Sequence, residues 1–135
     1  MNASVIIPAF RKEALLEKCL VSLKRSFQGN LDYSVFVVDD GSGIDEKPIR
    51  QKVKANYDLY WHRFDKPRSR SAARNHGIKN SHGNIVIFLD SDMEVQKGFV
   101  ESHLKAHENS TSKAIIGNIL WPESGSFYRY TSTRG

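Results

Sequence analysis

Two carboxylates stand one residue apart, at Asp90 and Asp92, directly after the most apolar run of the chain at residues 85–89. Carboxylate oxygens at this spacing suit a Mg²⁺ or Mn²⁺ ion that also binds phosphate oxygens, and a buried strand would hold them rigidly. The alternative is that Asp90 only ends a strand and Asp92 caps the next helix. The motif therefore raises the hypothesis of a metal ion that carries a diphosphate.

A second acidic strand end favours this hypothesis. Asp39 and Asp40 follow the apolar run at residues 34–38 and precede the turn residues Gly41 and Ser42. In open α/β sheets, ligands bind beyond the carboxyl ends of the strands. We therefore expect the two acidic pairs to line one shared cleft.

The elements that must position these carboxylates alternate between strand and helix. In the first helix, apolar residues recur every fourth place from Leu15 to Phe27, and Ser71 is the expected N-cap of the third helix. Strands are expected at residues 4–8, 34–38, 59–63, 85–89 and 114–120, and helices at 12–27, 46–55, 71–78 and 99–107. This order predicts an α/β fold with a mainly parallel (mixed) sheet flanked by helices, and residues 122–135 show no clear period.

The composition is that of one soluble globular domain. The 135 residues are 39% hydrophobic and 26% charged, and no run approaches the ~18 apolar residues of a membrane span. Because Met1 leads almost directly into a predicted strand, we expect no signal peptide. The single cysteine, Cys19, lies on the apolar face of a predicted helix and excludes an internal disulfide. These features favour a cytoplasmic protein.

The formal net charge is +5, and much of the excess falls between residues 63 and 79, where Asp65 is the only acidic residue. The phosphates of a nucleotide, a nucleic acid or an anionic membrane surface would suit such a segment, and a solvated loop is the simpler alternative. The basic residues of this segment are Arg63, Lys66, Arg68, Arg70, Arg74 and Lys79.

Other α/β families fit the sequence less well. A dinucleotide-binding Rossmann domain would have a Gly-rich turn after the first strand, where this chain has Pro8-Ala9-Phe10. A response-regulator receiver would carry its aspartate pair after the first strand and a lone phosphoacceptor after the third. An aspartyl phosphatase would place Asp-x-Asp on an early strand before a small hydroxyl residue, whereas Met93 follows it here. The phosphatase stays an alternative of lower rank.

Four segments match one known family in order and spacing. They are Ser4-Val5-Ile6-Ile7-Pro8-Ala9-Phe10, Val37-Val38-Asp39-Asp40-Gly41-Ser42, Ala72-Ala73-Arg74-Asn75-His76-Gly77-Ile78 and Phe88-Leu89-Asp90-Ser91-Asp92. Together they resemble the family-2 glycosyltransferases of the Rossmann-like GT-A fold. The resemblance implies transfer of a sugar from a nucleotide diphosphate, by family habit UDP, to an acceptor hydroxyl with a divalent metal, Mn²⁺ or Mg²⁺.

The resemblance also assigns roles on the nucleoside side. Pro8, Ala9 and Phe10 would form one wall of the base pocket, with core packing as the alternative for Phe10. Asp40 takes the position that hydrogen-bonds the base or the ribose. Asp39 would either join it in binding the nucleotide or brace the turn.

On the phosphate side, Asp92 would be the principal metal ligand, and Asp90 would approach the ribose and share the metal. Arg70 and Arg74 would bind the phosphates, with a surface salt bridge as the alternative for Arg74. His103 and His107 are four residues apart but have no evident third ligand, so they are interpreted as surface or core histidines.

The chain departs from the family pattern in three ways. Arg11 stands where Asn is common, Met93 stands where a second acidic residue often follows, and the sequence stops early. In inverting members the general base comes from a later segment. No residue here maps onto it, because Glu123 is expected in a turn, so we expect the general base beyond Gly135.

The early stop also bears on domain organisation. We interpret residues 1–135 as a single donor-binding domain without its acceptor half. An apolar edge at residues 115–121 would then be exposed where that half packs, and it would favour self-association.

The acceptor is expected to be a glycan, a lipid carrier or a protein, and any membrane association of the intact protein would be peripheral. Two other functions stay open. A nucleotidyltransferase of similar fold usually has a basic, Gly-rich turn after its first strand, which is absent here. A nucleic-acid-binding module would interleave aromatic residues with the basic segment, so no nucleic acid is expected as partner.

Overall fold

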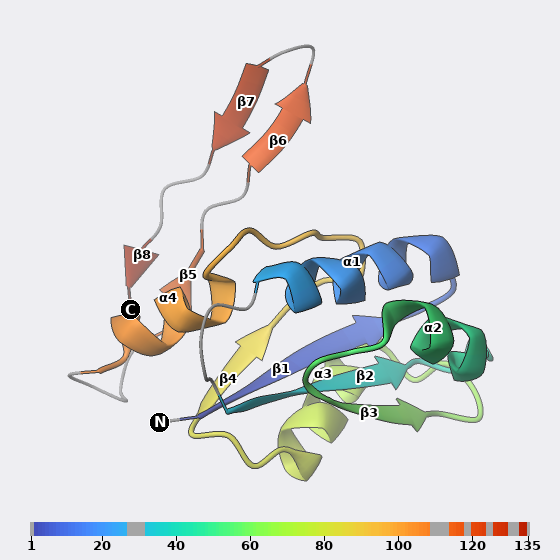
Figure 1. Ribbon diagram of the computed structural model, residues 1–135. Coiled ribbons are helices and arrows are strands. Elements are labelled where there is room, and N and C mark those ends of the chain that lie inside the picture. The colour runs from blue at the N-terminus through green and yellow to red at the C-terminus, as the bar shows by residue number, and fades with distance from the viewer. Residues whose placement is uncertain are drawn as a thin grey trace.

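Four parallel strands form the main sheet. The structure is a computed structural model, and it describes residues 2–26, 32–108, 114–117, 120–123, 126–129 and 133–134. The strands are β1 (Ala3–Ala9), β2 (Tyr33–Asp39), β3 (Asp58–Arg63) and β4 (Ile85–Phe88), in the order β3-β2-β1-β4 (Figure 1). Because all four are parallel, their carboxyl ends meet at one edge, as the sequence predicts.

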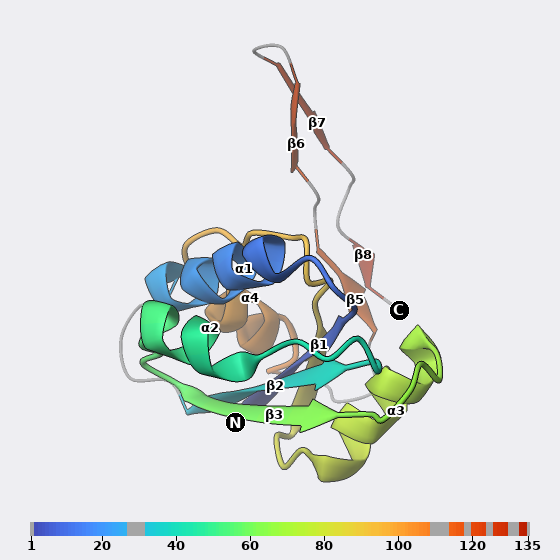
Figure 2. The same cartoon turned by 90° about the vertical axis from the view of Figure 1, so that its right-hand side faces the viewer.

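Helices cover both faces of this sheet. The helices are α1 (Glu13–Ser26), α2 (Glu46–Val53), α3 (Arg70–Asn80) and α4 (Phe99–Ala106). Figures 1 and 2 show α1, α2 and α4 on one face and α3 on the opposite face. The predicted α/β architecture is therefore confirmed.

The core forms where α1 packs on the two central strands. Leu16, Leu20 and Leu23 are fully buried on one side of α1, in one cluster with alternate residues of β1 and β2 such as Val5 and Val35. The strands read as continuous apolar runs because both faces are covered. This core fixes the strand ends at which the predicted site residues lie.

On the other face, α3 lies close to β1 because Gly77 has no side chain. A Cβ atom at Gly77 would lie 2.5 Å from the Ile6 Cγ2 atom. Ala73 of the same helix is fully buried against Val38 and Phe64. Small residues therefore bring the basic N-terminus of α3 next to the strand ends.

One prediction of local structure was wrong, and another holds in part. Helix α3 begins at Arg70, and its N-cap is Ser69, whose hydroxyl accepts from the Ala72 amide at 3.0 Å, so Ser71 lies inside the helix. The run at residues 85–89 was predicted as a buried strand, and Ile85, Ile87 and Leu89 are buried. Strand β4 lies at the edge of the described four-stranded sheet, however, and the Phe88 side chain is 48% exposed.

After α4 the chain forms short strands. They are β5 (Ile115–Ile116), β6 (Leu120–Glu123), β7 (Ser126–Arg129) and β8 (Thr133–Arg134), paired as β5 with β8 and β6 with β7. Glu123 was predicted in a turn but pairs with Ser126 as the last residue of β6. Residue 27, where the first predicted helix ends, and most side chains of the predicted edge at 115–121 lie outside the described residues. None of the described helices is long and apolar enough to span a membrane.

Candidate functional site

A pocket of about 230 Å³ lies at the carboxyl ends of β1, β2 and β4. We call it the strand-end pocket. It is lined by Pro8, Ala9, Phe10, Lys12, Asp40, Arg70, Asp90, Ser91 and Asp92. The structure thus brings together seven of the nine predicted site residues, and it leaves out Asp39 and Arg74.

The wall after β1 is formed by Phe10 and Lys12, and Arg11 connects them. Phe10 is 41% exposed, so its ring is not part of the core. Arg11 and Lys12 both have left-handed backbone conformations, with φ of 56° and 54°. Such conformations cost about 1 kcal/mol or more per non-glycine residue, and they cluster at functional sites.

Local hydrogen bonds hold this unusual bend in place. The Arg11 amide donates to the Ser42 hydroxyl at 2.8 Å, and the Lys12 carbonyl accepts from the Leu15 and Leu16 amides at 3.1 Å to start α1. The bend places Lys12 on the pocket wall. The sequence did not reveal Lys12 as a site residue, because neither Arg11 nor Lys12 is a residue type that indicates a left-handed backbone.

Asp39 lies under the turn and not in the pocket. Its carboxylate is fully buried and accepts from the Ser42 amide at 3.0 Å, the Ser42 hydroxyl at 2.6 Å and the Ile44 amide at 2.8 Å. This contact set matches the bracing interpretation of Asp39. Gly41 completes the turn, because its φ is 79° and a Cβ there would lie 2.2 Å from the Lys66 carbonyl carbon.

Asp40 connects the end of β2 to the loop before α3. Its amide donates to the Ala9 carbonyl at 2.8 Å, and its carboxylate accepts from the Arg68 amide at 2.7 Å and the Ser69 amide at 3.2 Å. The side chain is half-buried and still lines the pocket. Asp40 therefore fixes the start of α3, and with it Arg70, next to the strand ends.

The second acidic motif forms a tight turn, which we call the acidic turn (residues 90–93). The Met93 amide donates to the Asp90 carbonyl at 3.1 Å, so Ser91 and Asp92 are the two central residues. The Asp90 and Asp92 side chains are exposed to solvent at the pocket. A hydrogen-bonded turn at a strand end thus presents both carboxylates at the pocket.

Arg74 contacts the acidic turn from α3. Its guanidinium lies 3.6 Å from the Asp90 carboxylate and 5.7 Å from the centre of the Phe88 ring. The Arg74 and Asp90 side chains are 35% and 51% exposed, so the pair contributes little to stability. The structure places Arg74 beside the pocket, where its partner is Asp90.

The donor set of the pocket fits a hard divalent cation that is completed by its ligand. Within the described residues, no group of three or more His, Cys, Asp or Glu side chains is already assembled around a cation position. Asp90 and Asp92 supply two carboxylates from one turn, and Mg²⁺ or Mn²⁺ usually takes its remaining oxygens from water and substrate phosphates. Lys12 and Arg70 add positive charge at the same pocket.

The position of the general base stays a prediction. The sequence predicts it beyond Gly135, and Gly135 itself lies outside the described residues. Glu123 is the only carboxylate that follows Glu108 in the sequence. It pairs with Ser126 in the two-stranded sheet of β6 and β7, which is separate from the main sheet. We therefore assign no general base among the residues that the structure describes.

His103 and His107 do not form a comparable centre. Burial, and then the neighbouring His107, lowers the pKa of His103. His107 is itself buried in α4's C-terminal turn. This placement agrees with the interpretation of the two residues as surface or core histidines.

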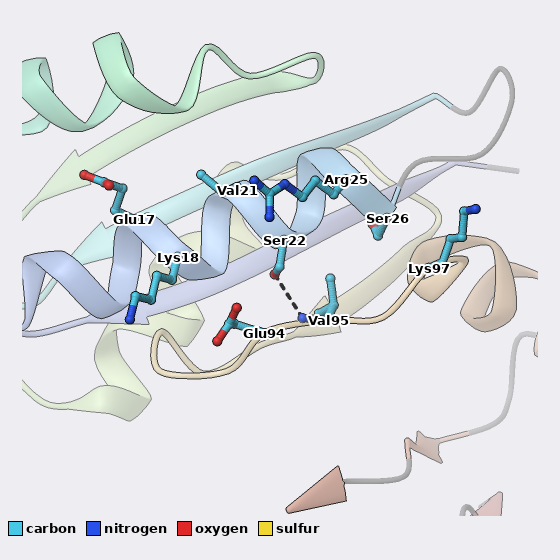
Figure 3. A pocket seen from close by; sticks show the side chains of 9 residues that line it. All are labelled: Glu17, Lys18, Val21, Ser22, Arg25, Ser26, Glu94, Val95 and Lys97. Carbon is cyan, nitrogen blue, oxygen red and sulfur yellow. Dashed lines mark hydrogen bonds between the residues drawn. The ribbon is translucent and has the colours of Figure 1, made fainter. Parts of the chain in front are cut away.

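A larger groove, of about 680 Å³, lies between α1 and the segment after the acidic turn (Figure 3). We call it the side groove. Its charged residues are of both signs, because Glu17 and Glu94 accompany Lys18, Arg25 and Lys97. It does not open at the strand ends, where parallel α/β sheets bind their ligands. The strand-end pocket is therefore the candidate site despite its smaller volume.

Curated relatives of this chain are glycosyltransferases. The chain is 35% identical to the uncharacterized glycosyltransferase YfnE of Bacillus subtilis. The match covers 95% of this chain and 32% of that protein. It is 30% identical to the GalNAc(5)-diNAcBac-PP-undecaprenol beta-1,3-glucosyltransferase of Campylobacter jejuni, over 98% of this chain and 42% of that protein. The chain thus spans well under half the length of these relatives.

Solved structures agree with the sequence relatives. The S. aureus TarS 1-349 structure in complex with UDP-GlcNAc matches with a TM-score of 0.69 and 25% identity, over 81% of this chain and 32% of that chain. TarS 1-349 without a named ligand matches with a TM-score of 0.70. The four-stranded parallel sheet flanked by helices is thus that of GT-A-like glycosyltransferases. The model of the family described as Glycosyl transferase family 2 matches residues 4–134, so the chain belongs to glycosyltransferase family 2.

Proposed function

We propose that this chain is the donor-binding part of a glycosyltransferase that takes a sugar from a UDP-sugar. The observation that carries the proposal is the composition of the strand-end pocket. It places the exposed Phe10 ring next to the acidic turn and next to two basic side chains, Lys12 and Arg70. A nucleoside diphosphate has the same sequence of chemical groups, from a flat base through a ribose to two phosphates. The chain's membership of family 2 supports the same assignment.

In this proposal the base lies against Phe10 and the backbone of Pro8 and Ala9. Aromatic rings bind flat ligands by stacking, and Phe10 is available because it is not used by the core. Asp40 lies at the same wall and accepts from the base or the ribose while it holds the loop before α3. Asp39 acts through the turn alone.

The diphosphate lies between the acidic turn and the two basic residues. Asp92 and Asp90 would hold a divalent cation, Mn²⁺ or Mg²⁺, which when bound neutralises the charge that develops on the leaving diphosphate. Arg70 and Lys12 donate charge-assisted hydrogen bonds to phosphate oxygens. Arg74 keeps Asp90 oriented through their 3.6 Å contact.

Uridine is the proposed nucleoside because TarS, whose structure overlaps 81% of this chain, has been solved in complex with UDP and with UDP-GlcNAc. The proposed acceptor is a glycan or a lipid-linked glycan, since the Campylobacter relative is named for an undecaprenol-linked acceptor. Inversion at the anomeric carbon, a cytoplasmic or membrane-peripheral location, and a general base beyond Gly135 belong to the same proposal.

A thermal-shift panel tests the choice of ligand. The chain is melted with Mn²⁺ and, in parallel, with UDP, GDP, dTDP, a UDP-sugar and a nucleoside triphosphate. We expect the largest rise in melting temperature with the uridine ligands, because a ligand that binds the folded state stabilises it by mass action. A larger rise with the triphosphate would favour a nucleotidyltransferase. A uniform lack of response would contradict donor binding by this chain.

A further inference from the structure

Helix α1 contacts the segment that carries the acidic turn at two places. The Cys19 thiol lies 3.8 Å from the Asp90 carbonyl oxygen, and the Ser22 hydroxyl accepts from the Val95 amide at 2.9 Å. Figure 3 shows this second contact as a dashed line between α1 and the loop. The acidic turn therefore lies between two contacts with a single helix.

The Ser22 hydroxyl both donates and accepts in this position. It donates to the Cys19 carbonyl at 2.7 Å and accepts from the Val95 amide, and Ser22 is only 9% exposed. Without this hydroxyl the Val95 amide would lose its acceptor, which costs more than a solvent-exposed bond does. The contact bridges 73 positions of sequence, so it fixes tertiary structure and not only local geometry.

The contact restrains the exit from the acidic turn, while the sheet restrains the entry. On the entry side, the Leu89 amide donates to the Ile6 carbonyl of β1 at 3.0 Å. On the exit side, Val95 is three residues beyond Asp92 and is held by Ser22. The direction of the Asp92 carboxylate depends on both restraints, because the turn between them is closed by a single backbone bond from Met93.

We propose that Ser22 is a positioning residue for the divalent cation and diphosphate at the acidic turn. It touches neither ligand, and it acts by holding Val95 so that Asp92 faces the strand-end pocket. This proposal rests on the proposed function. It adds the prediction that a serine outside the strand-end pocket sets the metal-dependent affinity for the diphosphate.

Ser26 provides a matched control on the same helix. It is also buried, at 2% exposed, and its hydroxyl makes the same kind of bond, to the carbonyl three residues back, at 2.8 Å. The segment after β4 is bound at this point through backbone groups, because the Gly98 amide donates to the Ser26 carbonyl at 2.9 Å. A Ser26→Ala change therefore reproduces the loss of a buried helical hydroxyl without freeing that segment.

The test measures UDP affinity with Mn²⁺ and with a chelator for wild type, Ser22→Ala, Ser22→Thr and Ser26→Ala. We expect Ser22→Ala to weaken the Mn²⁺-dependent affinity about tenfold, the size of one lost buried hydrogen bond, and to leave the metal-free affinity unchanged. Ser22→Thr keeps the hydroxyl and should stay close to wild type, as should Ser26→Ala. Equal losses in Ser22→Ala and Ser26→Ala, or wild-type affinity in Ser22→Ala, would overturn the proposal.

Amide hydrogen exchange separates this inference from the proposed function. If wild type shows no metal-dependent UDP binding, the proposed function fails, and exchange at Met93 and Val95 still tests the role of Ser22. We expect both amides to be protected in wild type and in Ser26→Ala, and to exchange faster in Ser22→Ala. If Ser22→Ala does not fold, the contact is tested in wild type alone. A Val95 amide that exchanges there as fast as in an unstructured peptide refutes the contact.

Discussion

Asp39 and Asp40 are adjacent carboxylates with different proposed roles, since Asp39 braces the turn and Asp40 contacts the nucleotide. Replacing each by alanine should therefore separate effects on stability from effects on nucleotide binding. Asp39 is fully buried and accepts from two backbone amides and one hydroxyl within its own turn. Asp40 is half-buried at the pocket and accepts from two amides of the loop before α3. We expect Asp39→Ala to affect mainly folding and Asp40→Ala to affect mainly nucleotide affinity.

The magnitude for Asp39 follows from the donors that it leaves unpaired. A buried amide without an acceptor costs about 1–3 kcal/mol, so the loss of the Ser42 and Ile44 bonds should lower the free energy of unfolding by about 4 kcal/mol. That is a large part of the about 5–15 kcal/mol that stabilises an ordinary domain. The amides freed by Asp40→Ala belong to exposed residues and can bind water, so we expect a loss of about 1 kcal/mol there.

Urea unfolding gives the stability of each variant, and UDP titration gives its affinity. Asp39→Ala should unfold at much lower urea concentration, yet its remaining folded fraction should bind UDP. Asp40→Ala should unfold near the wild-type urea concentration and bind UDP at least about tenfold more weakly. The reasoning would be refuted if Asp39→Ala kept wild-type stability while it lost UDP affinity, because Asp39 would then contact the ligand.

Three further predictions concern other parts of the chain. Lys12→Ala should weaken UDP affinity without lowering stability, because Lys12 is exposed at the strand-end pocket; unchanged affinity in titration would remove it from the site. Gly77→Ala should lower stability in urea by about 1–3 kcal/mol, because the added Cβ would lie 2.5 Å from Ile6 Cγ2, and a gain of about 1 kcal/mol from helix propensity would contradict this packing. Burial and then His76 lower the pKa of His62 in the folded state below its ordinary 6.5. Below that pH the unfolded chain therefore binds more protons than the folded chain does. Stability is therefore fully present above about pH 6.5 and falls below it, and melting curves should show a smaller acid loss in His62→Gln than in wild type.

The acidic strand ends could be predicted from the sequence because local signals carry them. Apolar runs followed by Asp-Asp-Gly-Ser and Asp-Ser-Asp specify strands with polar ends, and the parallel order of the sheet then brings those ends together. The amphipathic spacing in α1 was equally local, and Cys19 and Leu23 of the predicted series are buried. Leu15 of that series is 38% exposed, and Phe27 lies outside the described residues. These features need no knowledge of distant contacts.

The features that the sequence did not reveal depend on distant contacts or on unusual backbone. Ser69 and Ser71 are both plausible caps, and Ser69 is the cap in the structure, where Asp40 binds its amide from the neighbouring strand. Lys12 reaches the pocket through a left-handed bend that Ser42 holds in place. The contact between Ser22 and Val95 has no signature in either segment.

The central claim is that the acidic turn binds a nucleoside diphosphate through a divalent cation. The most direct test is calorimetric titration of UDP with Mn²⁺ and with a chelator, for wild type, Asp92→Ala and Glu94→Ala. Glu94 is a suitable control because it is an exposed carboxylate two residues further along that lines the side groove instead. We predict binding that requires Mn²⁺, is lost in Asp92→Ala and persists in Glu94→Ala. Equal UDP affinity in wild type and Asp92→Ala would contradict the claim.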